Sequence, residues 1–163
     1  MMNYQVKRAT ITDIDNGLLD LYIDGYMLHH SNRPDIFPKK SNSELKEMFL
    51  NELNNGIHNF LMIVKDDNIL GLVSYHLKEK NDIKSLWIDE LVINKKYRGQ
   101  GYGTILINEM KEIGAINKCH RIDLNCWSFN EDALAFYKKL HFNNQRVILE
   151  YNLSNIGEEL NRE

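Results

Sequence analysis

The sequence predicts an α/β fold in which helices cover both faces of a mixed sheet. Three observations predict it. Apolar, β-branched runs separated by short polar turns fill the middle of the chain, one of them feeds a helix through a glycine-rich loop, and a further strand and helix follow. The expected order is β-α-α-β-β-β-α-β-α-β, a strand meander followed by a βαβ crossover.

The N-terminal half of the chain supplies the helical pair and the meander. A short strand at 4–8 precedes Thr10 and Asp13, which predict the cap of a first helix. Its apolar face is formed by Ile14, Leu18, Leu21 and Tyr22. Both prolines lie in 29–42, which we expect to be an ordered loop. Ser41 and Glu44 predict a capping box for a second helix that ends at Asn55-Gly56. The expected strands are 59–64, 69–77 and 85–93, with turns at 66–68 and 80–82.

The C-terminal half alternates helices with strands. Leu106, Met110 and Ile113 recur at helical spacing and predict a helix over 105–116. A strand over 121–127, a helical segment within 130–142 and a last strand over 145–153 follow, and the polar tail at 155–163 is expected to fray. We therefore expect residues 1–163 to form a single domain.

The composition excludes several classes of protein. Hydrophobic residues make up 43% of the 163 residues and the net charge is −3, without a dense basic run, so we expect no nucleic-acid partner. No apolar stretch is long enough to span a membrane and no signal peptide is recognised, so the expected location is the cytoplasm. Cys119 and Cys126 do not have metal-ligand spacing, and we expect no metal.

The segment from Tyr97 to Thr104 is the most informative part of the chain. It joins the strand Leu86–Ile93 to the helix that follows, and it contains glycines at 99, 101 and 103. Glycines let the main chain approach an anion closely, and a helix N-terminus presents unpaired N–H groups to it. Arg98 adds a permanent cation. The segment predicts a phosphate-binding loop, with an ordinary turn as the alternative.

The spacing of these residues rules out the two commonest phosphate motifs. The third glycine of G-x-G-x-x-G is missing, and no Lys-Ser or Lys-Thr pair follows as in a P-loop. The remaining pattern is Arg-x-x-Gly-x-Gly at Arg98, Gly101 and Gly103. It resembles the pyrophosphate loop of the GNAT superfamily of acyl-CoA-dependent N-acyltransferases.

A second motif strengthens this resemblance. The segment that begins at Asn130 is similar to the GNAT pattern N-x-x-A-x-x-[FL]-Y-x-x-x-G-F and matches it at Asn130, Ala133, Phe136, Tyr137 and Phe142. It departs at His141, where the family usually has Gly, so we expect a strained or remodelled helix end. The resemblance covers residues 4 to about 152 and implies the GNAT fold, with acetyl-CoA (CoA) as cosubstrate.

The resemblance also implies a cofactor site. Backbone groups of one strand would bind the pantetheine arm, the glycine-rich loop would bind the pyrophosphate, and the start of the later helix would contact CoA. The implied residues are Leu91, Val92, Ile93, Arg98, Gly99, Gln100, Gly101, Tyr102, Gly103, Thr104, Asn130, Ala133 and Phe136. For Asn130, a helix cap alone is the alternative.

Catalytic groups are implied on both sides of the thioester. Tyr137 would protonate the departing thiolate, although its place on the apolar helix face also fits core packing. Asp89 and Glu90 are both candidates for removing the acceptor's proton, and strand alternation predicts that they point to opposite faces. His29, His30, Arg33 and Asp35 lie where GNAT enzymes build the acceptor pocket, with a polar surface loop as the alternative.

The predicted function is acetyl transfer from acetyl-CoA to a primary amine by direct attack. A catalytically silent acyl-CoA-binding sensor and a binding protein for another phosphate ligand are the alternatives. The acceptor could be a small amine, a polyamine, an aminoglycoside or a peptide or protein amine. The sequence does not decide between a monomer and a homodimer.

Overall fold

The computed structural model describes residues 3–153, so the predicted fraying of 155–163 lies outside the described part of the chain. Its backbone divides into two compact units, one up to Phe129 and one from Asn130 onward, and each is described by itself. Among the described residues, no helix is long and apolar enough to cross a membrane.

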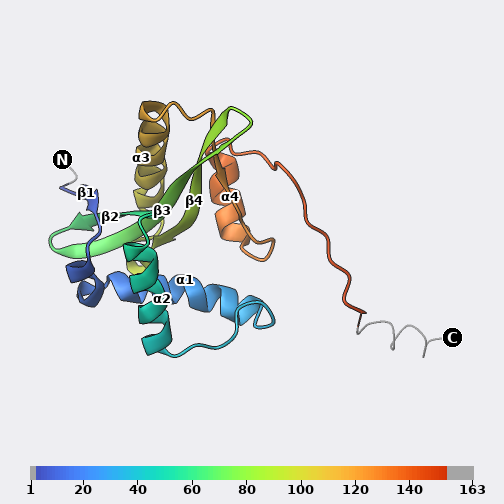
Figure 1. Ribbon diagram of the computed structural model, residues 1–163. Coiled ribbons are helices and arrows are strands. Elements are labelled where there is room, and N and C mark those ends of the chain that lie inside the picture. Colours follow the sequence, from blue (N-terminus) through green and yellow to red (C-terminus); the bar gives the residue numbers. More distant parts are fainter. Residues whose placement is uncertain (1–2, 154–163) are drawn as a thin grey trace. The chain divides into compact units, whose positions relative to one another are not determined.

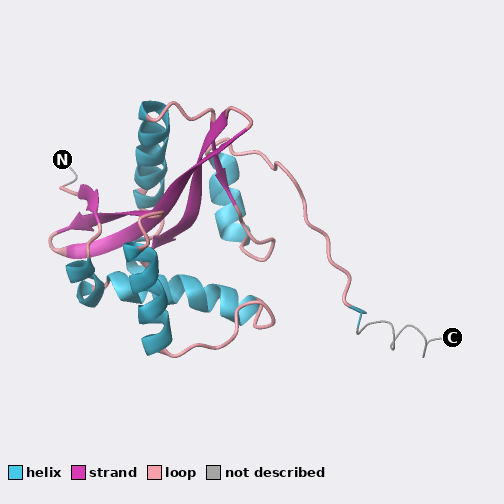
Figure 2. Ribbon diagram, in the orientation of Figure 1, coloured by secondary structure: helices cyan, strands magenta, loops and turns pink. Residues whose placement is uncertain are grey.

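The first unit contains a five-stranded mixed sheet (Figures 1 and 2). Its strands are β1 (Gln5–Arg8), β2 (Asn59–Lys65), β3 (Asn68–Lys80), β4 (Ile83–Ile93) and β5 (Arg121–Leu124), in that spatial order. Neighbouring strands are antiparallel except β4 and β5, which are parallel and are joined through a helix. The predicted α/β class with a meander and a βαβ crossover is confirmed.

Helices cover both faces of this sheet (Figure 1). On one face, α1 (Leu18–Asn32) and α2 (Asn42–Asn54) enclose a core in which Leu18, Leu45 and Phe49 are fully buried. On the other face, α3 (Tyr102–Ile116) buries Leu106, Ile107 and Met110. These residues recur at three- and four-residue spacing, which gives each helix an apolar stripe to bury.

Two tight turns set the register of the meander. Asp66 and Asp67 connect β2 to β3 with φ of 47° and 62°, and Asn81 and Asp82 connect β3 to β4 with φ of 53° and 60°. Positive φ at both central residues matches the right-handed twist of the flanking strands. Asn and Asp tolerate this conformation better than other residues with side chains, so the turns predicted at 66–68 and 80–82 form.

The first helical region differs from the prediction in two respects. Thr10 and Asp13 form the predicted capping box, but the box begins the 3-10 helix η1 (Ile11–Asn16), which ends at Gly17 with φ of 104°. A separate helix, α1, begins after Gly17 and continues to Asn32. His29 and His30 therefore belong to a helix, and the loop predicted at 29–42 begins only at Arg33.

The second unit contains α4 (Glu131–Lys139) but no strand among its described residues. The strand predicted at 145–153 is wrong for this part of the chain. Val147, Ile148 and Leu149 have the side chains of a strand but are 73%, 81% and 90% exposed, and their backbone pairs in no ladder. β-propensity reflects packing against neighbouring strands, so it forms no strand without them. The strand predicted at 121–127 is likewise shorter and ends at Leu124.

Candidate active site

The glycine-rich segment is built as a rigid connection between β4 and α3. Asn94 begins the short 3-10 helix η2 (Lys95–Tyr97): its side chain accepts a hydrogen bond from Lys96 N, and its own N–H donates to Leu70 O at 2.8 Å. Arg98 folds back so that Nε donates to Ile93 O at 3.0 Å. These bonds fix the backbone immediately before the glycines.

Gly99 and Gly101 have left-handed backbone conformations, with φ of 72° and 88°. Gly101 is the N-cap of α3, which no side chain caps and whose first turn contains no acidic residue. A Cβ at either glycine would meet no atom within 4 Å, so the space in front of this helix end is open. Free N–H groups, the positive end of the helix dipole and open space together suit an anionic ligand.

The residues of the loop that were predicted to bind CoA differ in where they lie. Gly99, Gly101 and the first helical residues Gly103 and Thr104 surround this helix end. Tyr102 is 5% exposed, so its side chain contributes to the core and only its backbone reaches the ligand side. Gln100 donates from Nε2 to Lys96 O at 3.4 Å.

β4 has an unpaired edge directly before this loop. Its parallel ladder with β5 covers Ser85 to Ile88 and stops there, whereas Leu91, Val92 and Ile93 pair only with β3. Along 89–93, one side of the strand therefore has no ladder partner among the described residues. A ligand with amide groups can hydrogen-bond to such an edge.

A β-bulge lies at the candidate bases. The register of β3 and β4 shifts between Ser74 and Tyr75, so Glu90 pairs with Ser74, Ile88 pairs with Tyr75, and Asp89 has no partner in β3. A bulge interrupts the alternation of side chains. His76 lies on the same face of β3 as Ser74, the partner of Glu90, and Asp89 Oδ2 lies 2.8 Å from His76 Nδ1. Both carboxylates therefore lie on one face, and the prediction that they point to opposite faces is wrong.

Glu90 lies beneath α1, where Gly25 makes room for it. A Cβ on Gly25 would overlap Glu90 Oε1. Glycine in a helix interior costs about 1 kcal/mol relative to alanine, so its presence here has a packing reason. Burial, followed by the charges of Glu52 and Asp89, raises the pKa of Glu90 to about 8. Within residues 3–153 its carboxylate accepts no hydrogen bond. A carboxyl group with a strongly raised pKa is a candidate functional group.

Asp89 is engaged by two histidines that the sequence did not indicate. Its Oδ2 lies 2.8 Å from His76 Nδ1 and 3.7 Å from His58 Nε2. These three side chains could be ligands of a metal, since their ligand atoms lie within 4.8 Å of one another. The side-chain oxygen of Asn55, Oδ1, accepts hydrogen bonds from Ile57 N and His58 N. The side-chain Nδ2 of Asn55 therefore donates to His58 Nδ1, at 2.9 Å. In neutral His58 the hydrogen is then on Nε2, which favours a hydrogen-bonded cluster over a metal site.

The residues predicted near the acceptor lie at the end of α1 and just after it. His30 Nδ1 donates to Phe37 O at 2.7 Å, and Arg33 forms two hydrogen bonds to Asp35, at 2.9 and 2.7 Å. These contacts order the loop between α1 and α2. His29 packs against aromatic rings, and burial lowers its pKa.

The second unit carries the remaining predicted residues. The Asn130 side chain caps α4 by accepting from Ala133 N at 3.3 Å, as the alternative interpretation of Asn130 predicts. The ring of Tyr137 lies 5.2 Å from Phe136 and 5.4 Å from Phe142, and it is partly exposed. His141 adopts φ of 67°, so the helix end keeps the left-handed conformation without a glycine.

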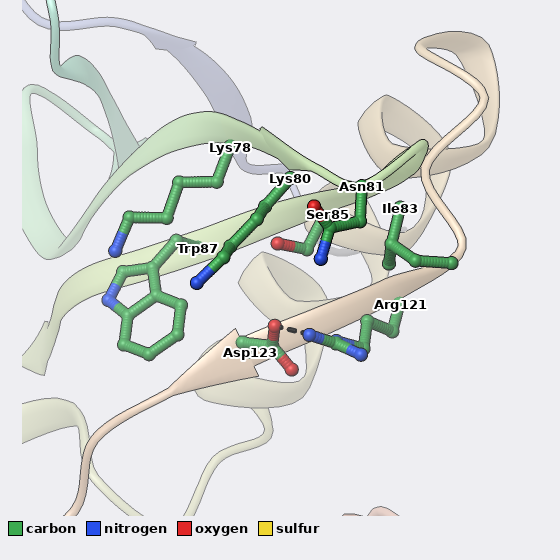
Figure 3. A pocket seen from close by; sticks show the side chains of 8 residues that line it. All are labelled: Lys78, Lys80, Asn81, Ile83, Ser85, Trp87, Arg121 and Asp123. Carbon is green, nitrogen blue, oxygen red and sulfur yellow. Dashed lines mark hydrogen bonds and ion pairs between the residues drawn. The ribbon is translucent and has the colours of Figure 1, made fainter.

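A hollow of about 320 Å³ lies elsewhere, at the turn between β3 and β4 (Figure 3). Lys78 stacks over Trp87 at 4.2 Å, and Arg121 donates to Asp123 at 2.8 Å. The remaining lining residues are Lys80, Asn81, Ile83 and Ser85. None of the residues predicted to bind CoA or to catalyse transfer lines this hollow.

A glycine-rich loop at an open helix N-terminus, next to an unpaired strand edge and the half-buried Glu90 carboxylate, defines a candidate acyl-CoA site. In agreement, residues 22–142 match the model of the Acetyltransferase (GNAT) family. The chain belongs to this family.

Relatives of the chain include named N-acetyltransferases, and a solved structure shares its fold. Glucosamine 6-phosphate N-acetyltransferase 1 of Dictyostelium discoideum is 32% identical over 87 residues, 52% of this chain and 54% of that protein. A spermine/spermidine N(1)-acetyltransferase of Bacillus subtilis is 25% identical over 52% of this chain and 64% of its own length. A protein of Bacillus halodurans, solved as a tetramutant, shares the fold with a TM-score of 0.82 and 22% identity, over 91% of this chain and 99% of that one. The chain thus spans between half and two thirds of these two curated relatives.

Proposed function

We propose that the protein transfers an acetyl group from acetyl-CoA to a primary amine, and that residues 1–163 act as one domain. The observation that carries the proposal is the unpaired edge of β4 leading into Gly99 and Gly101 at the uncapped end of α3. This surface suits a ligand that has amides at one end and a pyrophosphate at the other. The cytoplasm remains the expected location.

The transfer is direct. The neutral amine attacks the thioester carbon, the carbon–sulfur bond breaks, and the CoA thiolate leaves with its electron pair. Tyr137, which has this role on its motif match, protonates the thiolate. Glu90 takes the ammonium proton before attack. We prefer it to Asp89 because Asp89 is hydrogen-bonded to His76, whereas the Glu90 carboxylate accepts no hydrogen bond from residues 3–153 and its pKa is raised to about 8.

The charges around Glu90 favour an unphosphorylated acceptor. Relatives are named for glucosamine 6-phosphate and for spermine, so both classes are candidates. Glu52 and Asp89 add negative charge near Glu90, which attracts an ammonium and repels a phosphate.

Thiol release tests the proposal. Acetyl-CoA is incubated with ethylamine, phenethylamine, spermine or glucosamine 6-phosphate, and free CoA is measured. We expect amine-dependent thiol release and a rise in Tm with CoA. A rise in Tm with no thiol release from any amine, including peptide and aminoglycoside amines, would support the silent acyl-CoA sensor. No rise in Tm would contradict both.

A further inference from the structure

One face of α1 connects the half-buried Glu90 carboxylate to a group of aromatic rings. Tyr22, Gly25 and His29 are spaced three and four residues apart, so they lie on the same face of the helix. Tyr22 donates to Glu52 at 3.0 Å, and Gly25 makes room for Glu90. His29 follows Gly25 by one helical turn, about 6 Å along the axis.

His29 is part of a ring cluster that also contains Phe37, Trp127 and Phe129. His29 stacks on Phe37 at 4.9 Å and meets Phe129 at 5.9 Å, while Trp127 lies 5.8 Å from Phe37 and stacks on Phe129 at 5.9 Å. The four rings come from α1, from the loop after it and from the segment after β5. All four are half-exposed and stand outside the buried core. A compact group of half-exposed rings is typical of a binding surface.

Hydrogen bonds from α1 to the backbone of the loop at 37–38 hold the ring cluster in place. Tyr26 donates from its hydroxyl to Pro38 O at 2.7 Å, and His30 donates to Phe37 O at the same distance. Phe37 therefore sits on a fixed backbone, and the cluster presents a preformed surface whose use costs little ordering entropy.

The charges of the cluster do not favour an anionic ligand. Arg33 lies 5.3 Å over the Trp127 ring and forms two hydrogen bonds to Asp35. Burial lowers the pKa of His29, so the imidazole is neutral at pH 7. His29 Nδ1 is buried and, among the described residues, is the one buried side-chain polar atom without a hydrogen-bond partner. A neutral aromatic surface binds apolar groups.

We infer that the acceptor lies along this face of α1, with its reacting amine at Glu90 and an apolar body against His29, Phe37, Trp127 and Phe129. The favoured substrates are primary amines carried on an apolar chain or ring, without a phosphate or carboxylate. This inference rests on the proposed function and names its substrate class.

Two amines that differ only in their bodies test it. Ethylamine and phenethylamine carry the same reacting group, and only phenethylamine has a ring to place on the cluster. We expect kcat/KM for phenethylamine to exceed that for ethylamine at least tenfold in the parent protein. Trp127→Leu should lower this ratio at least fivefold through the KM of phenethylamine. The control Tyr4→Ala removes an exposed ring directly before β1, which lies at the opposite edge of the sheet from β5, and should leave the ratio unchanged.

The outcomes separate this inference from the proposed function. Equal kcat/KM for the two amines would overturn the ring cluster as acceptor surface but would leave the proposed acetyltransferase activity standing. A kcat/KM for glucosamine 6-phosphate above that for phenethylamine would have the same meaning. A Trp127→Leu variant that folds, as judged by its Tm, and keeps the parent ratio would do the same. Absence of thiol release with any amine would remove the proposed function itself.

Discussion

At the scale of single residues, Glu90 lies where its carboxyl group is hard to ionise. Glu90 occupies the space that Gly25 leaves in α1, and burial together with Glu52 and Asp89 raises its pKa to about 8. Its value in the unfolded chain is about 4.3. Glu90 therefore holds an extra proton in the folded state between these two values, and folding stability falls as pH rises through that range.

Glu90→Gln should separate catalysis from stability. In the parent protein kcat/KM should rise with pH to a plateau above about pH 8, and the variant should lose about 10²–10⁴-fold of that plateau. At pH 9 the variant should be more stable than the parent, by an amount on the order of 1–3 kcal/mol, because its side chain at position 90 stays uncharged. The difference should shrink towards pH 5. Denaturant unfolding at both pH values measures it.

Asp89→Asn is the matched comparison for Glu90→Gln. Asp89 is hydrogen-bonded to His76 at the bulge, so its loss should change the plateau far less. If Asp89→Asn alone lowered the plateau, Asp89 would be the base and our choice of Glu90 would be reversed. If neither did, His29 would be the next group to test.

His141 offers a second prediction at this scale. Its φ of 67° is a conformation that costs residues with a Cβ roughly 1 kcal/mol or more. His141→Gly should therefore raise the free energy of unfolding by about 0.5–1 kcal/mol, or the Tm by about 2–4 °C. His141→Ala keeps the Cβ and should give no such gain. An equal gain from both variants would assign the effect to the imidazole.

At the scale of elements, the connection between β4 and α3 carries the proposed cofactor site. Gly101→Val places a branched side chain in the open space at the helix N-terminus and should abolish CoA binding, measured by calorimetry. Gly17→Val is the matched control, because Gly17 also has a positive φ, precedes a helix and faces empty space. Both variants carry the same backbone strain. If Gly101→Val bound CoA as tightly as Gly17→Val, the loop assignment would be wrong.

Short sequence patterns correctly predicted the elements that are formed by residues close together in the chain. The capping boxes at Thr10 and Ser41, the turns at 66–68 and 80–82 and the loop at Gly99 and Gly101 all form, because each needs only residues close in sequence. The bulge at Asp89 and the cluster of Asp89 with His58 and His76 depend on strand register, which no short pattern encodes. The sequence did not predict the ring cluster because its residues, such as Phe37 and Trp127, are far apart in the chain and meet only in the folded structure. The strand expected at 145–153 failed because composition does not supply a pairing partner.

At the scale of the whole molecule, the proposed function assigns the acid that protonates the thiolate to Tyr137. Tyr137→Phe should leave CoA affinity and the Tm nearly unchanged, since only a hydroxyl is lost, and should lower kcat about 10²–10⁴-fold. Stopped-flow measurement of thiol release detects the chemical step even where product release limits turnover. An unchanged chemical step would return Tyr137 to a packing role against Phe136 and Phe142.

The two tight turns of the meander have a consequence for how this chain can change. Asp66, Asp67, Asn81 and Asp82 all hold positive φ that glycine would adopt without a Cβ penalty. A glycine in either turn would therefore raise the free energy of unfolding, at positions remote from Glu90 and from the ring cluster. Substitutions that reshape an acceptor surface are usually destabilising, and proteins tolerate them only above a stability threshold. Glycine at the second position of either turn would widen that margin, so new acceptor specificities are best selected in a background that carries it.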